Sequence, residues 1–366
     1  MLKLKGTGHI KHHLGCNYGR DEDGTLYSEP TDYVEKMLSN YEKIFGKKPR
    51  QYSSPLSKGD HPELDTSELL EMEETKIYQS MIGALQWVIQ IGRFDIATAV
   101  MTLSRFRAAP RRGHLDRVKR VYGYLSKMRH GAIRIRTELP DFSDIPEKHY
   151  DWENTCYVGA KELVPDDAPV PRGKPVQTSH YEDANLYHCL ISGKSVTGIL
   201  HFLNKTPIDW FTKLQSTVET ATYGSEYVSA RTCSEQIIDI RLTLRYLGVP
   251  LIGKSMMFGD NESVVNSSMI PHSKLHKRHN ALSYHKTRDA IAAGILRFIF
   301  IRSEENPADI LSKHWDYPSV WNQLRPLLFW KGDTQPIAHL SGPRQTEEDT
   351  STATDKVEGP VTNRGE

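Results

Sequence analysis

Apolar residues between positions 68 and 128 recur at steps of three and four, which is the spacing of amphipathic helices. A second predicted helix covers 96–103, and a third covers 114–128. The first and clearest helix has the apolar positions Tyr78, Met81, Ile82, Leu85, Val88 and Ile89. Residues 68–128 are therefore expected to form a helical region with its own apolar core.

Two strand-like runs precede these helices, at 9–14 and 25–27. The sequence Asp-Glu-Asp-Gly at 21–24 lies between them, and its Asp-Gly ending is a frequent hairpin turn. Thr31 is the expected N-cap of a helix over 31–38, because its hydroxyl can accept a bond from a backbone N–H of the first turn.

The second half of the chain shows a different order of elements. Strands are expected at 180–188, 195–203, 207–212, 254–260 and 296–301. A long helix at 220–247 ends before Gly248, a residue type common after helix ends. Further helices are expected at 263–269 and 275–293, and a last one begins at Asn306-Pro307. This order predicts a mixed five-stranded sheet with helices packed on it, an α/β (α+β) fold.

Two stretches lack such patterns. Residues 137–176 are rich in proline and acidic residues and read as a linker or a loosely packed insertion. Residues 331–366 contain few large apolar side chains and are expected to form a disordered tail. The predicted organisation is therefore 1–136, a linker at 137–176, a domain at 177–330 and a tail at 331–366.

The composition excludes several classes of protein. The four cysteines lie far apart without a CxxC pair, which argues against a zinc module or a disulfide framework and favours a reducing compartment. No run of about 18 apolar residues and no signal-peptide core is present. We expect a soluble, intracellular protein.

Positive charge is concentrated although the formal net charge is only +1. Residues 105–136 contain eleven lysines and arginines against one acid, Asp116. Such a run is often a solvated face, but an excess of this size inside a nearly neutral protein also suits a phosphate backbone. The candidate nucleic-acid-binding residues are Arg105, Arg107, Arg111, Arg112, Arg117, Lys119 and Arg120.

Four acids occupy positions from which they can converge. Asp183 falls in the first strand of the second half, Glu226 early in the long helix, Asp260 at a strand end and Asp309 in the first turn of the last helix. Clustered carboxylates repel one another unless cations neutralise them, and oxygen ligands suit Mg²⁺ or Mn²⁺. Two such ions, about 3.5–4 Å apart, would activate a water and stabilise the leaving oxygen in phosphodiester cleavage.

Each acid also has an ordinary interpretation. Asp260 could cap a helix, Asp309 could interact with a helix dipole, and Glu226 could lie on a helix surface. Spacing alone does not select these four among 46 acids.

Motifs around the four acids resemble the ribonuclease H domain of copia-type long-terminal-repeat retrotransposon polyproteins. Tyr-Glu-Asp-Ala-Asn at 181–185 resembles the family's Tyr-Ser-Asp-Ala-Asp, and Ser-Glu-Tyr-Val at 225–228 resembles Ala-Glu-Tyr-Val. Asp-Asn-Glu-Ser at 260–263 resembles Asp-Asn-Gln-Ser, and Ala-Asp-Ile-Leu-Ser-Lys at 308–313 resembles Ala-Asp-Ile-Phe-Thr-Lys. Upstream, 78–85 and 95–100 resemble the helical region that follows the family's reverse-transcriptase palm.

The resemblance implies a ribonuclease H-like domain preceded by a mainly helical, thumb- or connection-like end of a reverse transcriptase. It implies an endonuclease that cuts the RNA strand of RNA–DNA hybrids and leaves a 3′-hydroxyl. Asp183, Glu226, Asp260 and Asp309 would be both the catalytic residues and the ligands of Mg²⁺ or Mn²⁺. The partners would be the hybrid or template–primer duplex and a palm from another chain, in cytoplasmic particles or the nucleus.

The chain departs from the family in several places. The family has an acid where this chain has Asn185 and a glutamate where it has Gly224, and many ribonucleases H have a histidine in the loop that here reads Ser-Glu-Glu-Asn-Pro at 303–307. His279 and His285 are interpreted as structural or phosphate-facing. Because no Tyr-x-Asp-Asp motif occurs, DNA synthesis by this chain is not expected. A non-catalytic nucleic-acid-binding remnant stays open as the alternative, and an integrase-type transferase, which needs a late glutamate in place of Asp309, is disfavoured.

Overall fold

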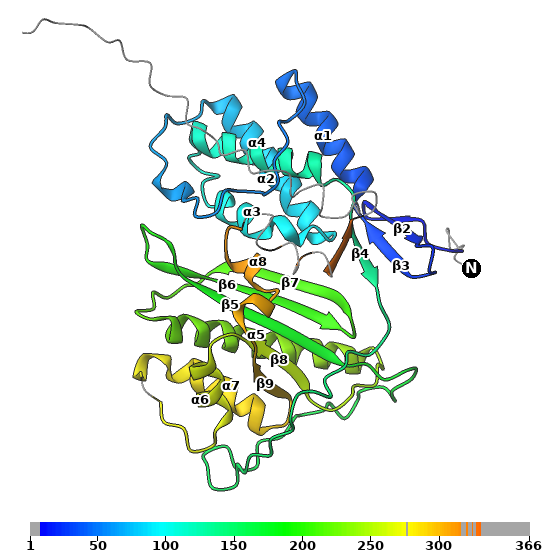
Figure 1. Cartoon of the computed structure of the whole chain (residues 1–366), viewed down its shortest axis with the longest axis vertical. Coiled ribbons are helices and arrows are strands. Elements are labelled where there is room, and N and C mark those ends of the chain that lie inside the picture. The colour runs from blue at the N-terminus through cyan, green and yellow to red at the C-terminus, as the bar shows by residue number, and fades with distance from the viewer. Residues whose placement is uncertain (1–7, 276, 316–319, 321–323, 325–326, 331–366) are drawn as a thin grey trace, which may run out of the picture. The chain divides into compact units, whose positions relative to one another are not determined.

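The computed structural model describes residues 8–275, 277–315, 320, 324 and 327–330 (Figure 1). The tail predicted at 331–366 lies outside the described residues. No helix in the described part of the chain combines the length and the apolar character that a membrane span requires.

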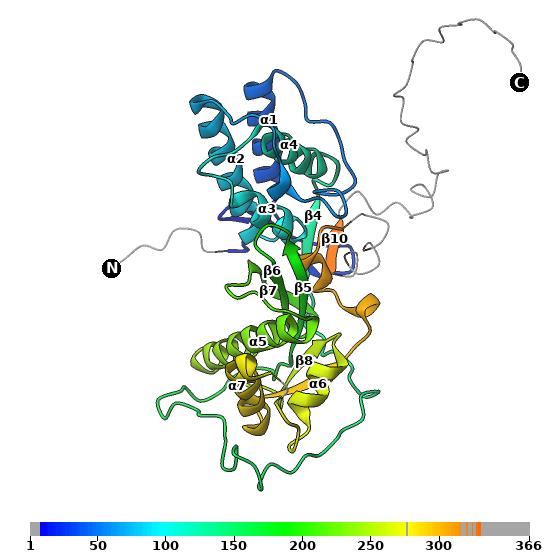
Figure 2. The same ribbon diagram turned by 90° about the vertical axis from the view of Figure 1, so that its left-hand side faces the viewer.

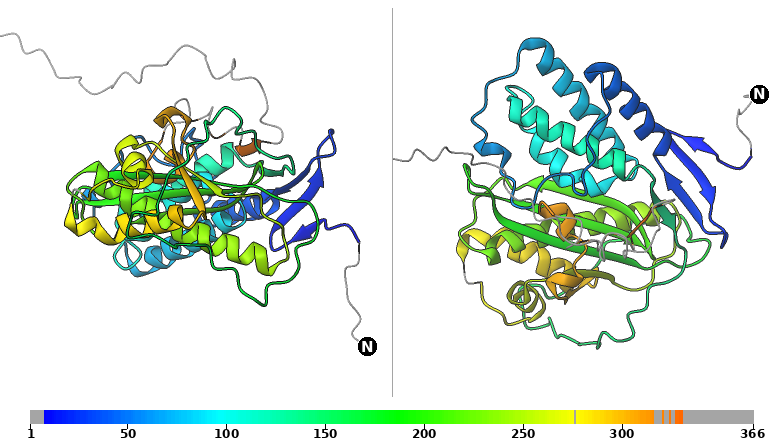
Figure 3. Two further views of the ribbon diagram at one scale, coloured as in Figure 1. Left: turned by 90° about the horizontal axis from the view of Figure 1, so that it is seen from below. Right: turned by 45° about the horizontal axis from the view of Figure 1, so that its top comes forward.

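The first half of the chain contributes four α-helices and four strands of a sheet, which a strand from near residue 330 completes. The five-stranded sheet has the order β1-β2-β3-β4-β10 and consists of β1 (His12–His13), β2 (Cys16–Arg20), β3 (Leu26–Glu29), β4 (Gly131–Ile135) and β10 (Leu328–Trp330). The helices are α1 (Thr31–Phe45), α2 (Met72–Gln90), α3 (Ala97–Ser104) and α4 (Arg112–Lys127). In Figure 3, all four helices lie on one side of the other sheet of the protein, which is formed by residues 178–300.

Two local predictions in this half are wrong. The strand before the Asp-Gly turn is β2, because Leu14 and Gly15 have φ values of 50° and 92° and reverse the chain between β1 and β2. Thr31 is the first residue of α1, and Pro30 occupies the cap position. The Thr31 hydroxyl donates to the side chain of Glu29 at 3.1 Å and so does not cap the helix.

The predicted apolar stripe of α2 is buried as expected. It packs with α3 and α4 around a buried ion pair between Arg93 and Asp95, whose closest atoms are 2.7 Å apart. The same core includes Leu200 of the second sheet and Leu311 near the end of the chain. Helices and second sheet therefore share one apolar core.

The second sheet is mixed and has the order β7-β6-β5-β8-β9. Its strands are β5 (Thr178–Cys189), β6 (Lys194–Leu203), β7 (Thr206–Leu214), β8 (Ser255–Gly259) and β9 (Leu296–Phe300). Strands β5, β6 and β7 are antiparallel, whereas β5–β8 and β8–β9 are parallel. This confirms the predicted mixed five-stranded sheet with helices.

Helices cover both faces of this sheet. They are α5 (Thr222–Tyr246), α6 (Glu262–Met269), α7 (Ala281–Ala292) and the short α8 (Asp309–Ser312). Ile199 packs in the core beneath α5, and its neighbour Leu200 packs on the side of α8, because successive strand residues point to opposite faces. At Gly198 the backbone of α8 comes so close that a Cβ would lie 2.7 Å from the carbonyl carbon of Leu311.

Residues 137–176 contain no helix or strand apart from one bridging residue, Val176. In Figure 2 they form the long green loop that passes below α6 and α7. Trp152 and Tyr157 stack on the buried guanidinium of Arg288, with 4.9 and 5.2 Å from its central carbon to the ring centroids. Glu162 pairs with Arg241 at 2.7 Å. The stretch is thus anchored at specific points, and the domain boundaries at 136 and 176 stay a prediction.

Candidate active site

Asp183 and Asp260 lie at the same level of two neighbouring strands. Parallel β5 and β8 are in register at Tyr181 and Phe258, so that two residues further on Asp183 stands beside Asp260. Asp260 follows the last residue of β8 directly. It does not cap the next helix, since the side chain of Asn261 accepts the backbone N–H of Val264 at 3.2 Å. The capping interpretation of Asp260 therefore does not apply.

Glu226 reaches the same place from the first turns of α5. This helix is fixed to β5 by Ser229, whose hydroxyl donates to the carbonyl oxygen of Asp183 at 3.1 Å. Ligand atoms of Asp183, Glu226 and Asp260 all lie within 4.8 Å of one another. Glu226 is buried, and its Oε2 has no hydrogen-bond partner among the described residues.

Asp309, the first residue of α8, joins this group through a lysine. The ammonium of Lys313 lies 2.5 Å from Oδ1 of Asp309 and 3.3 Å from Oδ1 of Asp183. The hydroxyl of Ser312 donates to the other oxygen of Asp183. All four acids named from the sequence thus lie in one neighbourhood at the ends of β5, β8, α5 and α8.

The pKa values of all four acids are raised, mainly by burial. Burial raises the pKa of Asp183 to about 6, although the ammonium of Lys313 works against this rise. Burial, followed by repulsion from Asp183, raises the pKa of Glu226 well above its ordinary value. The pKa values of Asp260 and Asp309 are raised as well, first of all by burial. Such shifts mean that ionised carboxylates here need more positive charge than the protein supplies.

A divalent cation fits this donor set. All candidate ligand atoms are carboxylate oxygens, which hard ions such as Mg²⁺ and Mn²⁺ prefer. The unpartnered Oε2 of Glu226 is a buried acceptor that a cation would satisfy.

Sequence reasoning missed one acid beside this group, Glu182. Its side chain is 1% exposed, and burial followed by repulsion from Asp183 and Asp260 raises its pKa well above the ordinary value. A Cβ at position 259 would lie 2.5 Å from Oε1 of Glu182. The absence of a side chain at Gly259 therefore leaves the space that Glu182 occupies. One signal was available, because the resembling motif has serine where this chain has Glu182.

The departures from the family motifs have local explanations. Gly224 lacks the side chain that would meet Glu219, since a Cβ there would lie 2.3 Å from its Oε2. His279 contacts the same Glu219 at 3.1 Å, and His285 contacts the hydroxyl of Tyr157 at 2.6 Å. Both histidines therefore have protein partners of their own.

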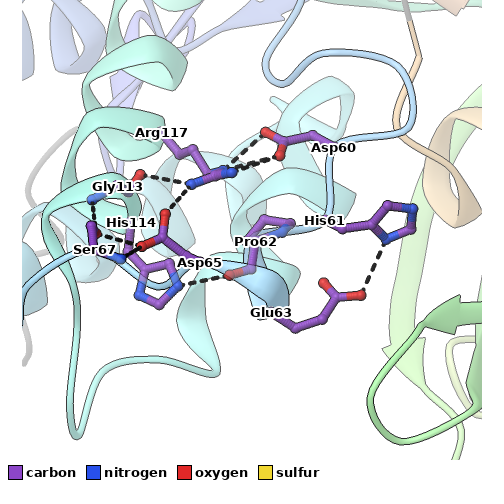
Figure 4. A network of polar contacts seen from close by, with 9 residues as sticks. All are labelled: Asp60, His61, Pro62, Glu63, Asp65, Ser67, Gly113, His114 and Arg117. Carbon is purple, nitrogen blue, oxygen red and sulfur yellow. Dashed lines mark hydrogen bonds and ion pairs between the residues drawn. The ribbon is translucent and has the colours of Figure 1, made fainter.

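The basic stretch 105–136 is partly neutralised by acids from other parts of the chain. Arg117 is held between Asp60 and Asp65, at 2.9 and 2.6 Å (Figure 4). Arg112 pairs with Glu68 and Glu74, whereas the partner of Lys119 is Asp116, the one acid of the stretch itself. Counting charges along the sequence therefore overstates the positive charge of this surface.

The four other candidates contact uncharged groups. Arg105 and Arg107 are exposed; Arg105 donates to the sulfur of Cys189 at 3.1 Å and Arg107 to the carbonyl of Ser104 at 3.1 Å. Arg111 donates to the carbonyl of Ser67, and Arg120 lies over the ring of Tyr52. Their role in binding nucleic acid stays a prediction.

The chain has relatives among curated proteins. No protein-family model matches the chain. The retrovirus-related Pol polyprotein from transposon TNT 1-94 of Nicotiana tabacum is 25% identical over 317 residues, which cover 85% of this chain and 21% of that protein. The corresponding polyprotein from transposon RE1 of Arabidopsis thaliana is 23% identical over 314 residues, which cover 85% of this chain and 18% of that protein. The chain therefore spans about a fifth of the length of these curated relatives.

Among solved structures, LC11-RNase H1 in complex with an RNA/DNA hybrid matches 37% of this chain and 94% of its own. It is 16% identical, with a TM-score of 0.30. The resemblance to copia-type Pol polyproteins that the motifs predicted is confirmed by the sequence relatives.

Proposed function

Because this chain is related to retrovirus-related Pol polyproteins of transposons, we propose that it is a ribonuclease H-type endonuclease. It would cut the RNA strand of an RNA–DNA hybrid and leave a 3′-hydroxyl. The observation that carries the proposal is the convergence of Asp183, Glu226 and Asp260, with all ligand atoms within 4.8 Å. These residues come from three different parts of the chain, and bound cations would neutralise the carboxylates that the fold brings together.

Asp183, Glu226, Asp260 and Asp309 would hold two Mg²⁺ or Mn²⁺ ions. When bound, such ions supply an activated water and charge stabilisation at the leaving oxygen. The protein's own contribution is positioning. Ser229 and Ser312 fix the backbone and the side chain of Asp183, and Ser303 donates to Oδ2 of Asp260 at 2.6 Å.

The substrate would be recognised by its shape and by the ribose hydroxyls, because base edges are not needed to distinguish RNA from DNA strands. Exposed Arg105 and Arg107 are the side chains we propose for contact with phosphates of the duplex. A polymerase palm supplied by another chain is the proposed protein partner. The proposed place of action is a cytoplasmic particle or the nucleus.

The test is cleavage of an end-labelled RNA–DNA hybrid by the full chain in Mg²⁺, with RNA–RNA and DNA–DNA duplexes as comparison substrates. Asp260→Asn should lower the rate at least about a hundredfold, because it removes about 3 kcal/mol of metal-borne stabilisation. Asp289→Asn is the matched control, since Asp289 is an exposed aspartate on α7. It should cleave like the parent chain.

Equal cleavage by the parent chain and Asp260→Asn would contradict the proposal. A parent chain that binds the hybrid without cutting it would support the alternative, a non-catalytic nucleic-acid-binding remnant.

A further inference from the structure

The cluster of four acids has two halves, and the protein supplies a positive charge in contact with only one of them. On one side, Lys313 bridges Asp183 and Asp309, at 3.3 and 2.5 Å. On the other side, Glu226 and Asp260 feel the charge of Lys313 from a distance, and Oε2 of Glu226 has no hydrogen-bond partner among the described residues. The protein's own cation therefore occupies only one half.

Lys313 stands where a second cation would have to bind. Asp183 is common to both halves, because one of its oxygens meets Lys313 while it also belongs to the group with Glu226 and Asp260. The ammonium of Lys313 contacts both Asp183 and Asp309, so an ion shared by these two acids would compete with it for the same oxygens. Two like charges cannot occupy the same position together.

The Lys313 side chain is also able to leave. Its side chain is 37% exposed, whereas that of Asp183 is 1% exposed. The lysine has a flexible four-carbon stem, so its ammonium can reach solvent, and an ion bound in its place would supply the positive charge that Asp183 and Asp309 lose. Of these charged groups, Lys313 is therefore the one with a path to solvent.

We propose that Lys313 is a positioning residue that acts as the resident counter-ion of the second cation site. In the protein without nucleic acid, one divalent ion binds among Asp183, Glu226 and Asp260. The Asp183–Asp309 half accepts a second ion only when Lys313 withdraws toward solvent, where it can meet a phosphate of the substrate. This inference rests on the proposed function, because it concerns the same carboxylates.

A purely structural role for Lys313 makes a different prediction. If the lysine only ties α8 to β5, its loss lowers stability and leaves the number of bound ions unchanged. The number of ions bound by the protein alone therefore separates the two roles.

The experiment is a titration of the full chain with Mn²⁺ without nucleic acid, read by calorimetry and by electron paramagnetic resonance. The parent chain should bind one ion tightly, and Lys313→Met should bind two. Coupling of this kind should tighten the second ion by about tenfold or more. Adding Asp309→Asn to Lys313→Met should return the count to one, because it removes the acid that the second ion needs.

Two controls have matched chemistry. Lys313→Arg keeps the positive charge and should bind one ion. Lys213→Met removes an exposed lysine from β7 and should also bind one ion.

Two tightly bound ions in the parent chain, or one ion in a folded Lys313→Met variant, would overturn the inference. If Lys313→Met does not fold, Lys313→Gln takes its place, since glutamine is uncharged but can still hydrogen-bond Asp309, and it should also bind two ions. Failure of the inference is distinguishable from failure of the proposed function, because hybrid cleavage and its loss in Asp260→Asn are measured separately from ion counting.

Discussion

Ser303 donates a hydrogen bond of 2.6 Å to Oδ2 of Asp260, which lies 43 residues earlier in the chain. Ser303 lies in the loop between β9 and α8, where many ribonucleases H have a histidine. A hydroxyl that holds a candidate ligand carboxylate from outside orients that ligand without binding the ion itself. The loop thus has a positioning group although it lacks a histidine.

Replacing Ser303 by alanine should weaken binding of the ion at Asp260 by about tenfold, the lower end of what outer-shell partners contribute. Threonine keeps the hydroxyl and should restore most of the affinity. Mn²⁺ titration and the Mg²⁺ dependence of hybrid cleavage measure this directly. Equal affinity in Ser303→Ala and the parent chain would show that the bond does not orient Asp260.

The raised pKa values of the acids predict how pH changes stability. Groups with raised folded-state pKa values contribute stability that is present below their ordinary values and lost as pH rises through the folded values. For Asp183 this window runs from its ordinary 3.8 to about 6. The metal-free protein should therefore lose the contribution of these acids as pH rises through this window.

Mg²⁺ should reverse this loss, because it binds the ionised carboxylates that protons would otherwise occupy. The increase in melting temperature caused by Mg²⁺ should be large at pH 7.5 and small at pH 5. Buried histidines such as His188 and His314, whose pKa values burial lowers to about 4 and about 3, also change stability with pH. Their contribution is the same with and without Mg²⁺, so the increase caused by Mg²⁺ does not contain it. An increase that does not change between pH 5 and 7.5 would contradict the prediction.

The four acids could be named from the sequence because each lies in a motif that resembles the family's, and the patterns around them predicted the strands and helices that carry them. It was not sufficient for Glu182. Strand alternation places Glu182 and Asp183 on opposite faces, and nothing local shows that both faces are covered there. The space for Glu182 comes from Gly259, which lies on another strand.

The surface charge could not be predicted for a related reason. The partners of Arg117 are 57 and 52 residues earlier in the chain, outside the basic stretch. A count over neighbouring residues cannot include them. Trp152 and Tyr157 likewise lie in a proline-rich stretch, and only the position of Arg288 shows that they are anchors.

Arg117 is therefore expected to stabilise the fold, not the complex with nucleic acid. Arg117→Gln leaves Asp60 and Asp65, with side chains 16% and 9% exposed, without their cation. It should lower the free energy of unfolding by about 2 kcal/mol, measured by urea denaturation. The salt dependence of hybrid binding should stay unchanged.

The double variant Arg105→Gln/Arg107→Gln should show the reverse pattern. Stability should change little, and the slope of log affinity against log salt should become shallower by about 2, since two phosphate contacts are lost. Binding can be measured in Ca²⁺ or with Asp260→Asn so that the hybrid is not cut. An unchanged slope would assign Arg105 and Arg107 to an ordinary solvated face.

Glu182→Gln should stabilise the metal-free protein, because glutamine has nearly the same shape and no charge to bury. At pH 7.5 the folded chain must either keep Glu182 ionised in a buried site or keep it protonated far above its ordinary pKa, and both cost free energy that glutamine avoids. The expected gain in the free energy of unfolding is about 2 kcal/mol at pH 7.5 and close to zero at pH 4. Glu235→Gln is the control, since Glu235 is about half exposed on helix α5, and it should change stability little at either pH. A gain that is equal at both pH values would mean that packing, not the carboxyl group, is responsible.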